Sequence, residues 1–278
     1  MDNISIIEVF ISGRRIGRMA LTPEGMCGFE YDADWIQTGF SISPFYLPLK
    51  SGLIMAKRDP FGGNFGVFDD SLPDGWGNLL LDRYLQERGI DPYKLNILER
   101  LSLIGSTGRG ALEYYPDKSV VSDAEYLNFD SLAKEVAKIL ESKESKGSVD
   151  LLYKYGGSSG GARPKVFTKV DGREWLVKFK ATNDPVDVGE IEYNYSLLAR
   201  DCGIRMAETR LFDNRYFGVE RFDRAPQGKI HTVSAAGLLH ANYRIPSLDY
   251  SILLKLTLNL TKDMEQVAEM FRLMVFNV

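Results

Sequence analysis

The pattern of hydrophobic and polar positions predicts short strands in the first part of the chain. Ile4 to Ile11 is apolar and rich in β-branched residues, and Ser12-Gly13 leads into a second such run, Ile16 to Leu21. Two runs of this kind around a tight turn are typical of a β-hairpin. Proline and glycine are frequent between Ser43 and Gly66, which favours loops. A further strand is expected at Ala111 to Tyr115.

Two helices are expected before that last strand. Asp74 is a suitable N-cap for a helix that stops at Gly89. Lys94 to Ile104 has the spacing of a second helix, closed by Gly105. These helices separate the strands and give the first part of the chain a mixed character.

The composition then changes in a way that suggests a domain boundary. From Pro116 to Val149 the chain is mainly polar, with a helix expected at Ser131 to Ser142. Polar segments with few apolar positions are common between domains. We therefore expect a mainly β N-terminal subdomain at 1–115, a helix and linker at 116–149, and a second unit at 150–278.

The second unit begins with a glycine-rich segment between expected strands. Leu151 to Tyr155 is a short apolar run that we expect to be a strand, and Gly156 to Lys165 follows it. Val166 to Lys169 and Glu174 to Phe179 flank Asp171-Gly172, a strong signal for a hairpin turn.

The rest of the chain alternates between helices and strands. A helix is expected at Gly189 to Cys202, followed by a strand pair at Thr209 to Phe212 and Tyr216 to Glu220. Two more helices are expected near Leu248 to Leu258 and Lys262 to Phe276. The pattern as a whole predicts an α+β fold.

Composition narrows the possible functions. A formal net charge of -4 and a pI near 5.4 argue against non-specific DNA binding through a large positive field, though not against contact through a basic partner. Cys27 and Cys202 match no metal-binding spacing and are expected to be buried thiols. Neither a signal peptide nor a membrane span is expected, so the expected location is the cytoplasm.

The segment Gly156 to Lys165 suits a phosphate group. Glycines let several backbone N–H groups approach one anion closely. No Lys-Ser/Thr follows at Walker A spacing, and the next element is an expected strand, as in the glycine-rich loop of kinases. A flexible surface turn is the alternative interpretation of this segment taken alone.

Lys178 adds a second piece of kinase-like chemistry. It lies within the hydrophobic strand Trp175 to Phe179, where its charge needs a partner. In a kinase lobe such a lysine contacts nucleotide phosphates and pairs with a glutamate of the next helix, where Glu190 and Glu192 lie. A lysine directed to solvent is the alternative. Val219 to Arg224 then stands where an adenine ring would be held, or is a charged strand end.

Two other enzyme classes are disfavoured. The glycine run lacks the Gly-x-Gly-x-x-Gly motif between strand and helix that dehydrogenases use. The two histidines, His231 and His240, occur without a Gly-x-Ser-x-Gly motif, so structural roles are expected for them and a hydrolase is disfavoured.

Seven segments form a series that is far more specific than any one of them. In chain order they are Phe68 to Gly77, Ile104 to Glu113, Gly157 to Lys165, Trp175 to Lys180, Glu192 to Tyr195, Val219 to Arg224 and His231 to His240. The series resembles, in family order, the motifs of the HipA family of toxin–antitoxin serine/threonine kinases. It spans nearly the whole chain.

The resemblance implies a fold, cofactors and site residues. It implies a two-lobed, protein-kinase-related fold after a mainly β N-terminal subdomain, with ATP and Mg²⁺ as cofactors. It implies that Lys178 meets the phosphates, that Glu192 pairs with Lys178, and that Ser158 is an inhibitory autophosphorylation site, for which Ser159 is the alternative. The residues expected to bind ATP are Gly157, Ser159, Gly160, Gly161, Lys165, Lys178, Glu220 and Phe222.

The resemblance also implies partners. A HipB-like helix-turn-helix antitoxin is expected, with operator DNA contacted indirectly through it. The expected substrate is a protein such as an aminoacyl-tRNA synthetase, whose phosphorylation slows translation and growth.

One departure from the family limits the expected activity. In the family a helix like Met264 to Asn277 leads into an Asn-x-Asp-Asp-His-x-Lys-Asn-like catalytic loop, a motif that this sequence does not contain. No catalytic and no metal-binding residue is therefore expected in the chain, and turnover by this chain alone is not expected. An incomplete helical lobe should leave six apolar residues short of burial partners: Leu253, Leu256, Leu258, Met270, Phe271 and Met274.

Several explanations of that departure stay open. The chain is a fragment of a longer kinase, a truncated gene product, or half of a kinase that needs a second chain. The alternative function is a non-catalytic module that binds a nucleotide or the antitoxin and is derived from such a kinase.

Overall fold

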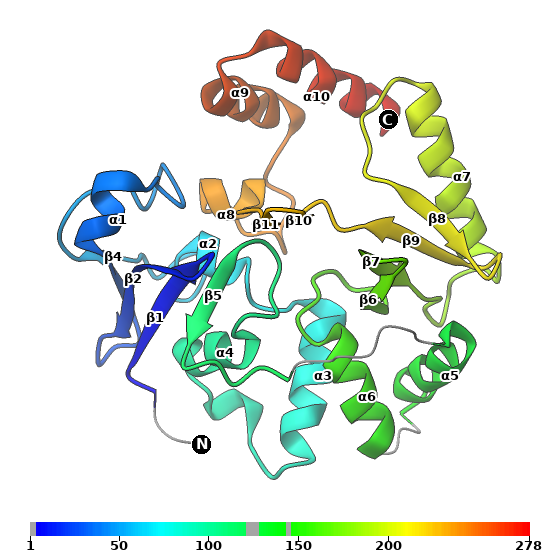
Figure 1. Ribbon diagram of the computed structural model, residues 1–278, viewed down its shortest axis with the longest axis horizontal. Coiled ribbons are helices and arrows are strands. Elements are labelled where there is room, and N and C mark those ends of the chain that lie inside the picture. Colours follow the sequence, from blue (N-terminus) through cyan, green and yellow to red (C-terminus); the bar gives the residue numbers. More distant parts are fainter. Residues whose placement is uncertain (1–3, 121–127, 143–145) are drawn as a thin grey trace.

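The computed structural model describes residues 4–120, 128–142 and 146–278, which form two antiparallel sheets surrounded by helices (Figure 1). The α+β fold expected from the sequence is confirmed. Two stretches of the predicted linker, 121–127 and 143–145, lie outside the described residues. No helix in the described part of the chain is long and apolar enough to cross a membrane.

The N-terminal sheet has five strands in the order β4-β3-β2-β1-β5. The strands are β1 (Ile6–Ile11), β2 (Arg14–Leu21), β3 (Cys27–Tyr31), β4 (Ile54–Met55) and β5 (Leu112–Tyr115). The expected hairpin is present, and Ser12 and Gly13 both have the positive φ that its tight turn requires. Side chains of this sheet pack against α1 (Ala33–Thr38) and α2 (Gly66–Asp69) to form the first hydrophobic core.

The helices of this region differ in one place from the expected pattern. α3 (Gly75–Gln86) follows Asp74 as predicted, but the single helix expected at Lys94 to Ile104 is two elements, η1 (Pro92–Lys94) and α4 (Ile97–Ile104). The break arises because Asn96 caps α4. Its side chain accepts the Glu99 N–H at 2.9 Å, while the Glu99 carboxylate accepts the Asn96 N–H at 2.8 Å.

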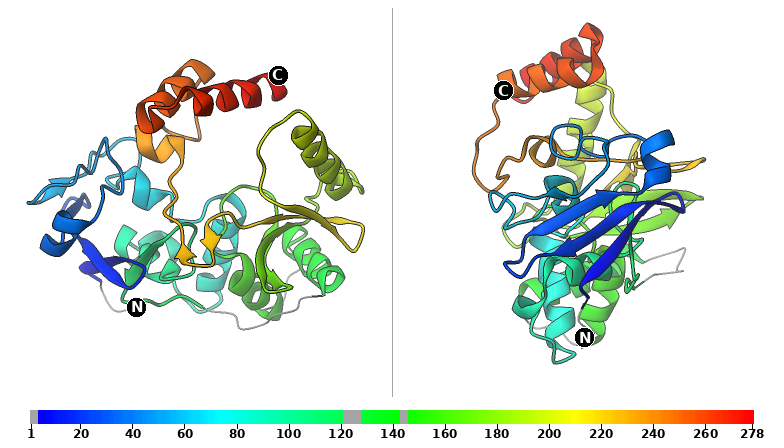
Figure 2. Two further views of the ribbon diagram at one scale, coloured as in Figure 1. Left: turned by 45° about the horizontal axis from the view of Figure 1, so that its top comes forward. Right: turned by 90° about the vertical axis from the view of Figure 1, so that its left-hand side faces the viewer.

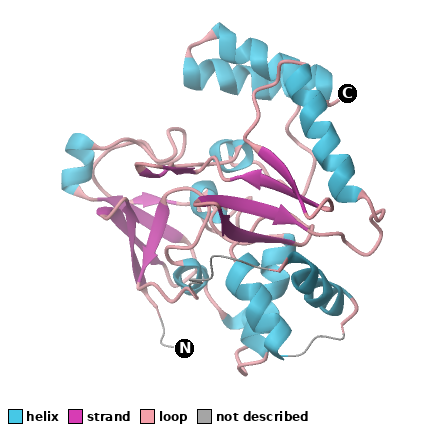
Figure 3. Ribbon diagram, turned by 45° about the vertical axis from the view of Figure 1, so that its right-hand side comes forward, coloured by secondary structure: helices cyan, strands magenta, loops and turns pink. Residues whose placement is uncertain are grey.

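The second sheet has four antiparallel strands in the order β6-β7-β9-β8. They are β6 (Lys165–Val170), β7 (Arg173–Lys178), β8 (Thr209–Phe212) and β9 (Tyr216–Glu220), which confirms both expected hairpins. Helices α3, α5 (Phe129–Leu140) and α6 (Lys146–Gly156) contribute to the core on one face, and α7 (Val188–Asp201) lies on the other (Figure 3). The second core thus combines α3 with the later part of the chain. The division of the chain at 115 and 150 stays a prediction.

The prediction of a strand at Leu151 to Tyr155 is wrong, because these residues belong to α6. A short apolar run is compatible with either a strand or a buried helix, and here the helix packs against α3. Tyr153 stacks on Tyr84 of α3 with 4.2 Å between the ring centroids. Leu152 is fully buried beside it.

After β9 the chain returns to the N-terminal sheet and then leaves it again. It forms the short pair β10 (Arg224–Ala225) and β11 (Gly228–Lys229), and then α8 (Ala235–Leu239), which packs on α2. His240 stacks on Tyr46 at 3.5 Å and its Nε2 accepts the Gly66 N–H at 3.1 Å. Burial lowers the pKa of His240 to about 4, so the ring is neutral at ordinary pH, in keeping with the structural role expected for it.

The chain ends with α9 (Tyr250–Thr261) and α10 (Met264–Phe276), which pack on each other at the periphery (Figure 2). Of the six apolar residues expected to lack burial partners, Leu256 is buried and the other five are half-buried or exposed. The expectation of two buried thiols holds for Cys27 but is wrong for Cys202, which is exposed at the C-terminal end of α7.

Candidate functional site

The glycine-rich loop between α6 and β6 is tightly hydrogen-bonded. The Gly157 N–H donates to the Tyr153 carbonyl at 2.8 Å, which extends the end of α6. Ser159 is fully buried, and its hydroxyl donates to the Gly156 carbonyl at 2.6 Å. The first half of the loop is therefore buried and internally hydrogen-bonded.

Residues just before and within α3 hold the other half of the loop. The Gly161 N–H donates to the Asp74 carboxylate, and the Gly161 carbonyl accepts the Trp76 N–H at 3.1 Å. The indole N–H of Trp76 also donates to the Lys165 carbonyl at 3.2 Å. Asp74 occupies the N-cap position of α3 as predicted, but its side chain makes no capping bond and serves the loop instead.

The close contact between the loop and α3 depends on glycines that the sequence interpretation did not connect with the loop. A Cβ at Gly75 would stand 2.6 Å from the Ala162 Cα, and a Cβ at Gly77 would collide with the Ser159 carbonyl oxygen. Gly160 is similarly covered by the Arg109 guanidinium. The signal for this contact was the pair of glycines that follows Asp74, two residues apart.

Lys178 and Glu192 form the ion pair that the sequence predicted. Their charged atoms are 2.7 Å apart, and the two side chains are 33% and 24% exposed. Lys178 also lies 5.1 Å from the centre of the Phe217 ring. Glu190, the other candidate on the same helix, makes no ion pair with any described residue. The alternative of a lysine directed to free solvent is wrong.

Arg163 is a further member of this cluster that the sequence interpretation missed. Its guanidinium lies 3.3 Å from the Glu192 carboxylate and 3.0 Å from that of Asp184. Its position in the glycine-rich loop was visible in the sequence, but its partners on later elements were not. Arg163 thereby ties the loop to α7.

Lys165 faces Lys178 directly across β6 and β7. It is 5% exposed, and its Nζ donates to the Gly160 carbonyl at 2.7 Å. Burial, together with the nearby charges of Lys178 and Arg109, lowers the pKa of Lys165 to about 8 against the opposing effect of Asp74. Two close cations, one of them poorly solvated, form a place where a phosphate would relieve an electrostatic cost.

The remaining expected ATP-binding residues lie farther along the same sheet. Glu220 pairs with Trp175, three residues from Lys178 along β7, a spacing of about 10 Å. The Glu220 carboxylate binds Arg173 at 3.3 Å, and the Phe222 ring is 68% exposed. The structure thus brings the loop, Lys165, Lys178 and Glu192 together, and places Glu220 and Phe222 at the other end of the strands.

The Ser158 side chain is directed away from Lys165 and Lys178. Its hydroxyl donates to the Thr107 carbonyl at 3.1 Å, so it faces the segment that follows α4. It is partly buried there.

A second group of charges fixes the segment that follows β9. Buried Asp223 accepts hydrogen bonds from Arg221 at 2.8 Å, Arg224 at 2.9 Å and the Gly110 N–H at 2.8 Å. Burial alone would raise the pKa of Asp223, but the Arg221 hydrogen bond and charge, with help from Gly110 and Arg224, hold it below its ordinary value. We call these contacts the junction network.

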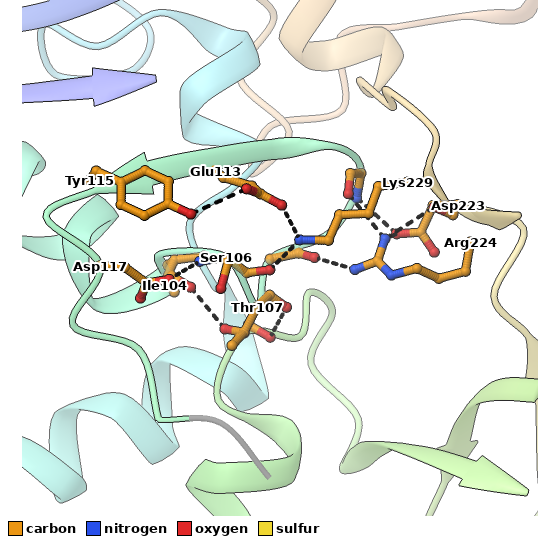
Figure 4. Close-up of polar contacts among 12 residues, drawn as sticks. Ile104, Ser106, Thr107, Glu113, Tyr115, Asp117, Asp223, Arg224 and Lys229 are labelled. Carbon is orange, nitrogen blue, oxygen red and sulfur yellow. Dashed lines mark hydrogen bonds and ion pairs between the residues drawn. The ribbon is translucent and has the colours of Figure 1, made fainter. Parts of the chain in front are cut away.

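Lys229 extends this network to the N-terminal sheet, as Figure 4 shows. Its Nζ donates to the Ser106 carbonyl and to the Glu113 carboxylate, each at 2.6 Å. Arg224 donates in addition to the Gly110 carbonyl at 3.0 Å. The chain after β9 is therefore bonded to the loop between α4 and β5.

The donor set fits phosphate groups better than a metal ion. Within the residues that the structure describes, no group of three or more His, Cys, Asp and Glu side chains is placed to hold a metal. Lysine, arginine and backbone N–H groups at the loop are typical ligands of phosphate oxygens.

Comparison with known proteins decides the family. A model of the HipA N-terminal domain matches residues 7–115, and a model of the HipA-like C-terminal domain matches residues 157–278. This chain belongs to the HipA family. No curated protein matched the sequence.

A solved structure extends this assignment to the fold. A chain in the Shewanella oneidensis MR-1 toxin–antitoxin complex of HipA, HipB and operator DNA matches with a TM-score of 0.66 and 19% identity. The match covers 98% of this chain and 68% of that one. The HipA-like fold implied by the sequence motifs is thereby confirmed.

Proposed function

We propose that this HipA-family chain carries the nucleotide-binding lobe of a serine/threonine protein kinase, the toxin of a type II toxin–antitoxin system. The observation that carries the proposal is the Lys178–Glu192 ion pair beside the glycine-rich loop and Lys165. A lysine fixed by a glutamate, next to a loop of backbone N–H groups, is the arrangement by which kinases hold nucleotide phosphates.

In this proposal each part of the site has a separate task. Glu192 keeps the Lys178 ammonium in place for the phosphates of ATP, and Lys165 and Arg163 add positive charge. Glu220 and Phe222 hold the adenine at the far end of the strands, about 10 Å away. Bound ATP would supply the phosphoryl group, with Mg²⁺ reaching the site on its phosphates.

The proposed partner is a HipB-like helix-turn-helix antitoxin. The Shewanella oneidensis structure, which matches nearly all of this chain, contains HipA, HipB and operator DNA. An acidic chain with a net charge of -4 would meet DNA through such a partner rather than directly. A protein such as an aminoacyl-tRNA synthetase is the proposed substrate, and the cytoplasm the proposed location.

Binding of ATP by the chain tests the nucleotide site. Titration calorimetry should show saturable binding, weakened about 10- to 100-fold by Lys178→Ala because charge-assisted hydrogen bonds are lost. Lys134→Ala, on the exposed surface of α5, is the matched control and should bind ATP as the unaltered chain does. Equal affinity of the Lys178→Ala and unaltered chains would refute the assigned role of Lys178.

Transfer of phosphate separates the kinase from the non-catalytic alternative. The chain is incubated with labelled ATP and Mg²⁺, and modification of Ser158 and Ser159 is read by mass spectrometry. Label at either serine supports kinase activity in this chain. ATP binding without label, in the presence and absence of a HipB-like protein, would favour a nucleotide-binding regulator.

A further inference from the structure

Arg109 is a charged residue of the N-terminal region that reaches the glycine-rich loop. It lies in the segment between α4 and β5, and its guanidinium lies against Gly160, where an added Cβ would stand 2.6 Å from the central guanidinium carbon. One of its terminal nitrogens donates to the Asp70 carbonyl at 2.7 Å. The side chain therefore contacts both the end of α2 and the loop.

The backbone on both sides of Arg109 is fixed by the junction network. The Gly108 carbonyl accepts Arg224 at 2.9 Å, and the Gly110 carbonyl accepts the same side chain at 3.0 Å (Figure 4). The Gly110 N–H donates to the buried Asp223 carboxylate at 2.8 Å. Buried charged bonds of this kind are costly to break. The Arg109 side chain thus extends from a rigid base.

The positive charge of Arg109 is not cancelled by an ion pair. The side chain is half-buried, and its Nε is buried without a hydrogen bond to any described residue. The Asp70 carboxylate is occupied by the N–H and the hydroxyl of Ser234, and it attracts Arg109 only at longer range. The charge of Arg109 can therefore act on its other neighbours.

Lys165 lies on the other side of Gly160. Its Nζ donates to the Gly160 carbonyl at 2.7 Å, so this peptide is held between two cations. The charged groups that act on Lys165 come from four segments and are Asp74, Arg109, Lys178 and Glu192. The two carboxylates favour the charged form of Lys165, and the other two groups disfavour it.

We propose that Arg109 is a positioning residue for the glycine-rich loop. It holds the Gly160 peptide beside Lys165, and its charge acts on the ammonium group that would meet a phosphate. The N-terminal part of the chain thereby controls both the shape and the charge of the phosphate site. This inference rests on the proposed function, in which the loop and Lys165 hold ATP.

A double-mutant cycle tests the contact with Gly160. Gly160→Ala places a methyl group where the guanidinium lies, and Gly160 does not have the positive φ that favours glycine, so the arginine side chain must move away. Gly160→Ala and Arg109→Ala should each weaken ATP binding about tenfold, and the double variant no more than either. Titration calorimetry measures the three affinities. Additive losses would overturn the proposal, since the two substitutions would then act separately.

The titration of Lys165 tests the effect of the Arg109 charge without ATP. Removing a neighbouring positive charge favours the protonated lysine, so Arg109→Gln should raise the pKa of Lys165 above its value of about 8. Arg109→Lys retains the charge and should keep that pKa low. NMR of isotope-labelled lysine measures it, with the Lys165 signal identified by its absence from Lys165→Arg. An unchanged pKa in Arg109→Gln would overturn the proposal.

Arg18→Gln is the matched control. Arg18 is an exposed arginine of β2 that pairs with Glu30 at 2.8 Å, and its removal should alter neither ATP affinity nor the pKa of Lys165. All variants are measured at a temperature where each is folded. A purely structural role of Arg109 would then change neither quantity.

The two measurements separate failure of this inference from failure of the proposed function. If the unaltered chain binds no ATP, the proposed function fails, and the Lys165 titration alone decides whether Arg109 acts on the loop. If the unaltered chain binds ATP and Arg109→Ala binds it equally well, the proposed function stands and the positioning role is overturned.

Discussion

The four-stranded sheet carries charged groups at both ends, and the two groups differ in burial. At one end, Lys178, Glu192 and Arg163 are partly exposed and join three separate segments. At the other end, Arg221 and Asp223 are almost fully buried and bonded on several sides. Partly solvated pairs exchange partners at small cost, whereas buried pairs are costly to break. The exposed group is suited to a ligand, and the buried group is suited to holding the chain in place.

The largest loss of stability should come from a substitution in the buried group of charges. Asp223→Ala leaves two arginines and the Gly110 N–H without their acceptor, so we expect a loss of about 3–5 kcal/mol in the free energy of unfolding. Urea denaturation followed by circular dichroism measures it. A loss below about 1 kcal/mol would show that the two ends do not differ as argued.

A smaller loss of stability is expected from a substitution where the glycine-rich loop contacts α3. Gly77→Ala places a methyl group against the Ser159 carbonyl, which must move, at a cost of about 1–3 kcal/mol. Gly147→Ala, at a helical position where the added Cβ meets nothing, is the control. Thermal unfolding of the two variants compares them, and equal melting temperatures would contradict the contact.

The affinity for ATP should depend on pH, because Lys165 at the partly exposed end of the sheet loses its charge near pH 8. The pKa of Lys165 is lowered to about 8, so the unliganded chain holds this charge below pH 8 and loses it above. ATP phosphates are already ionised above pH 7. Affinity should therefore be highest below pH 8 and fall by up to about tenfold per unit above it. Lys165→Arg, which stays charged, should bind without that fall.

The smallest change in stability is expected for the ion pair of the proposed ATP site. Lys178 and Glu192 are partly exposed, so Lys178→Ala should alter the free energy of unfolding by no more than about 1 kcal/mol. Urea denaturation beside Asp223→Ala makes the comparison direct. A loss as large as that of Asp223→Ala would mean that both ends are structural.

The sequence predicted the elements whose signals are local. Asp171-Gly172 marked the β6–β7 hairpin, and the hydrophobic strand around Lys178 called for a partner that proved to be Glu192. The prediction of a strand at Leu151 to Tyr155 was wrong because a five-residue apolar run is too short for its periodicity to distinguish a strand from a helix. The helical state of this segment is explained by its packing against α3, which the local sequence does not show.

Contacts between distant segments were beyond the reach of local patterns. Asp74 has the residue type and position of an N-cap, and nothing near it in the sequence shows that its carboxylate accepts the Gly161 N–H. Asp223 and Arg224 were visible as a charged strand end, but Gly110, their partner, lies more than one hundred positions earlier. Such pairs depend on topology rather than on propensity.

The return of α8 to α2 has a consequence for the timing of synthesis. The Gly66 N–H finds its acceptor in His240, 174 positions later, and Ser234 supplies hydrogen bonds to Asp70 across 164 positions. A ribosome that adds 5–20 residues per second needs about 9–35 s to pass from Gly66 to His240. Once β5 has been made, the complete first sheet still lacks the segment that closes over it, which leaves Tyr46 and the α2 surface exposed to factors that bind nascent chains.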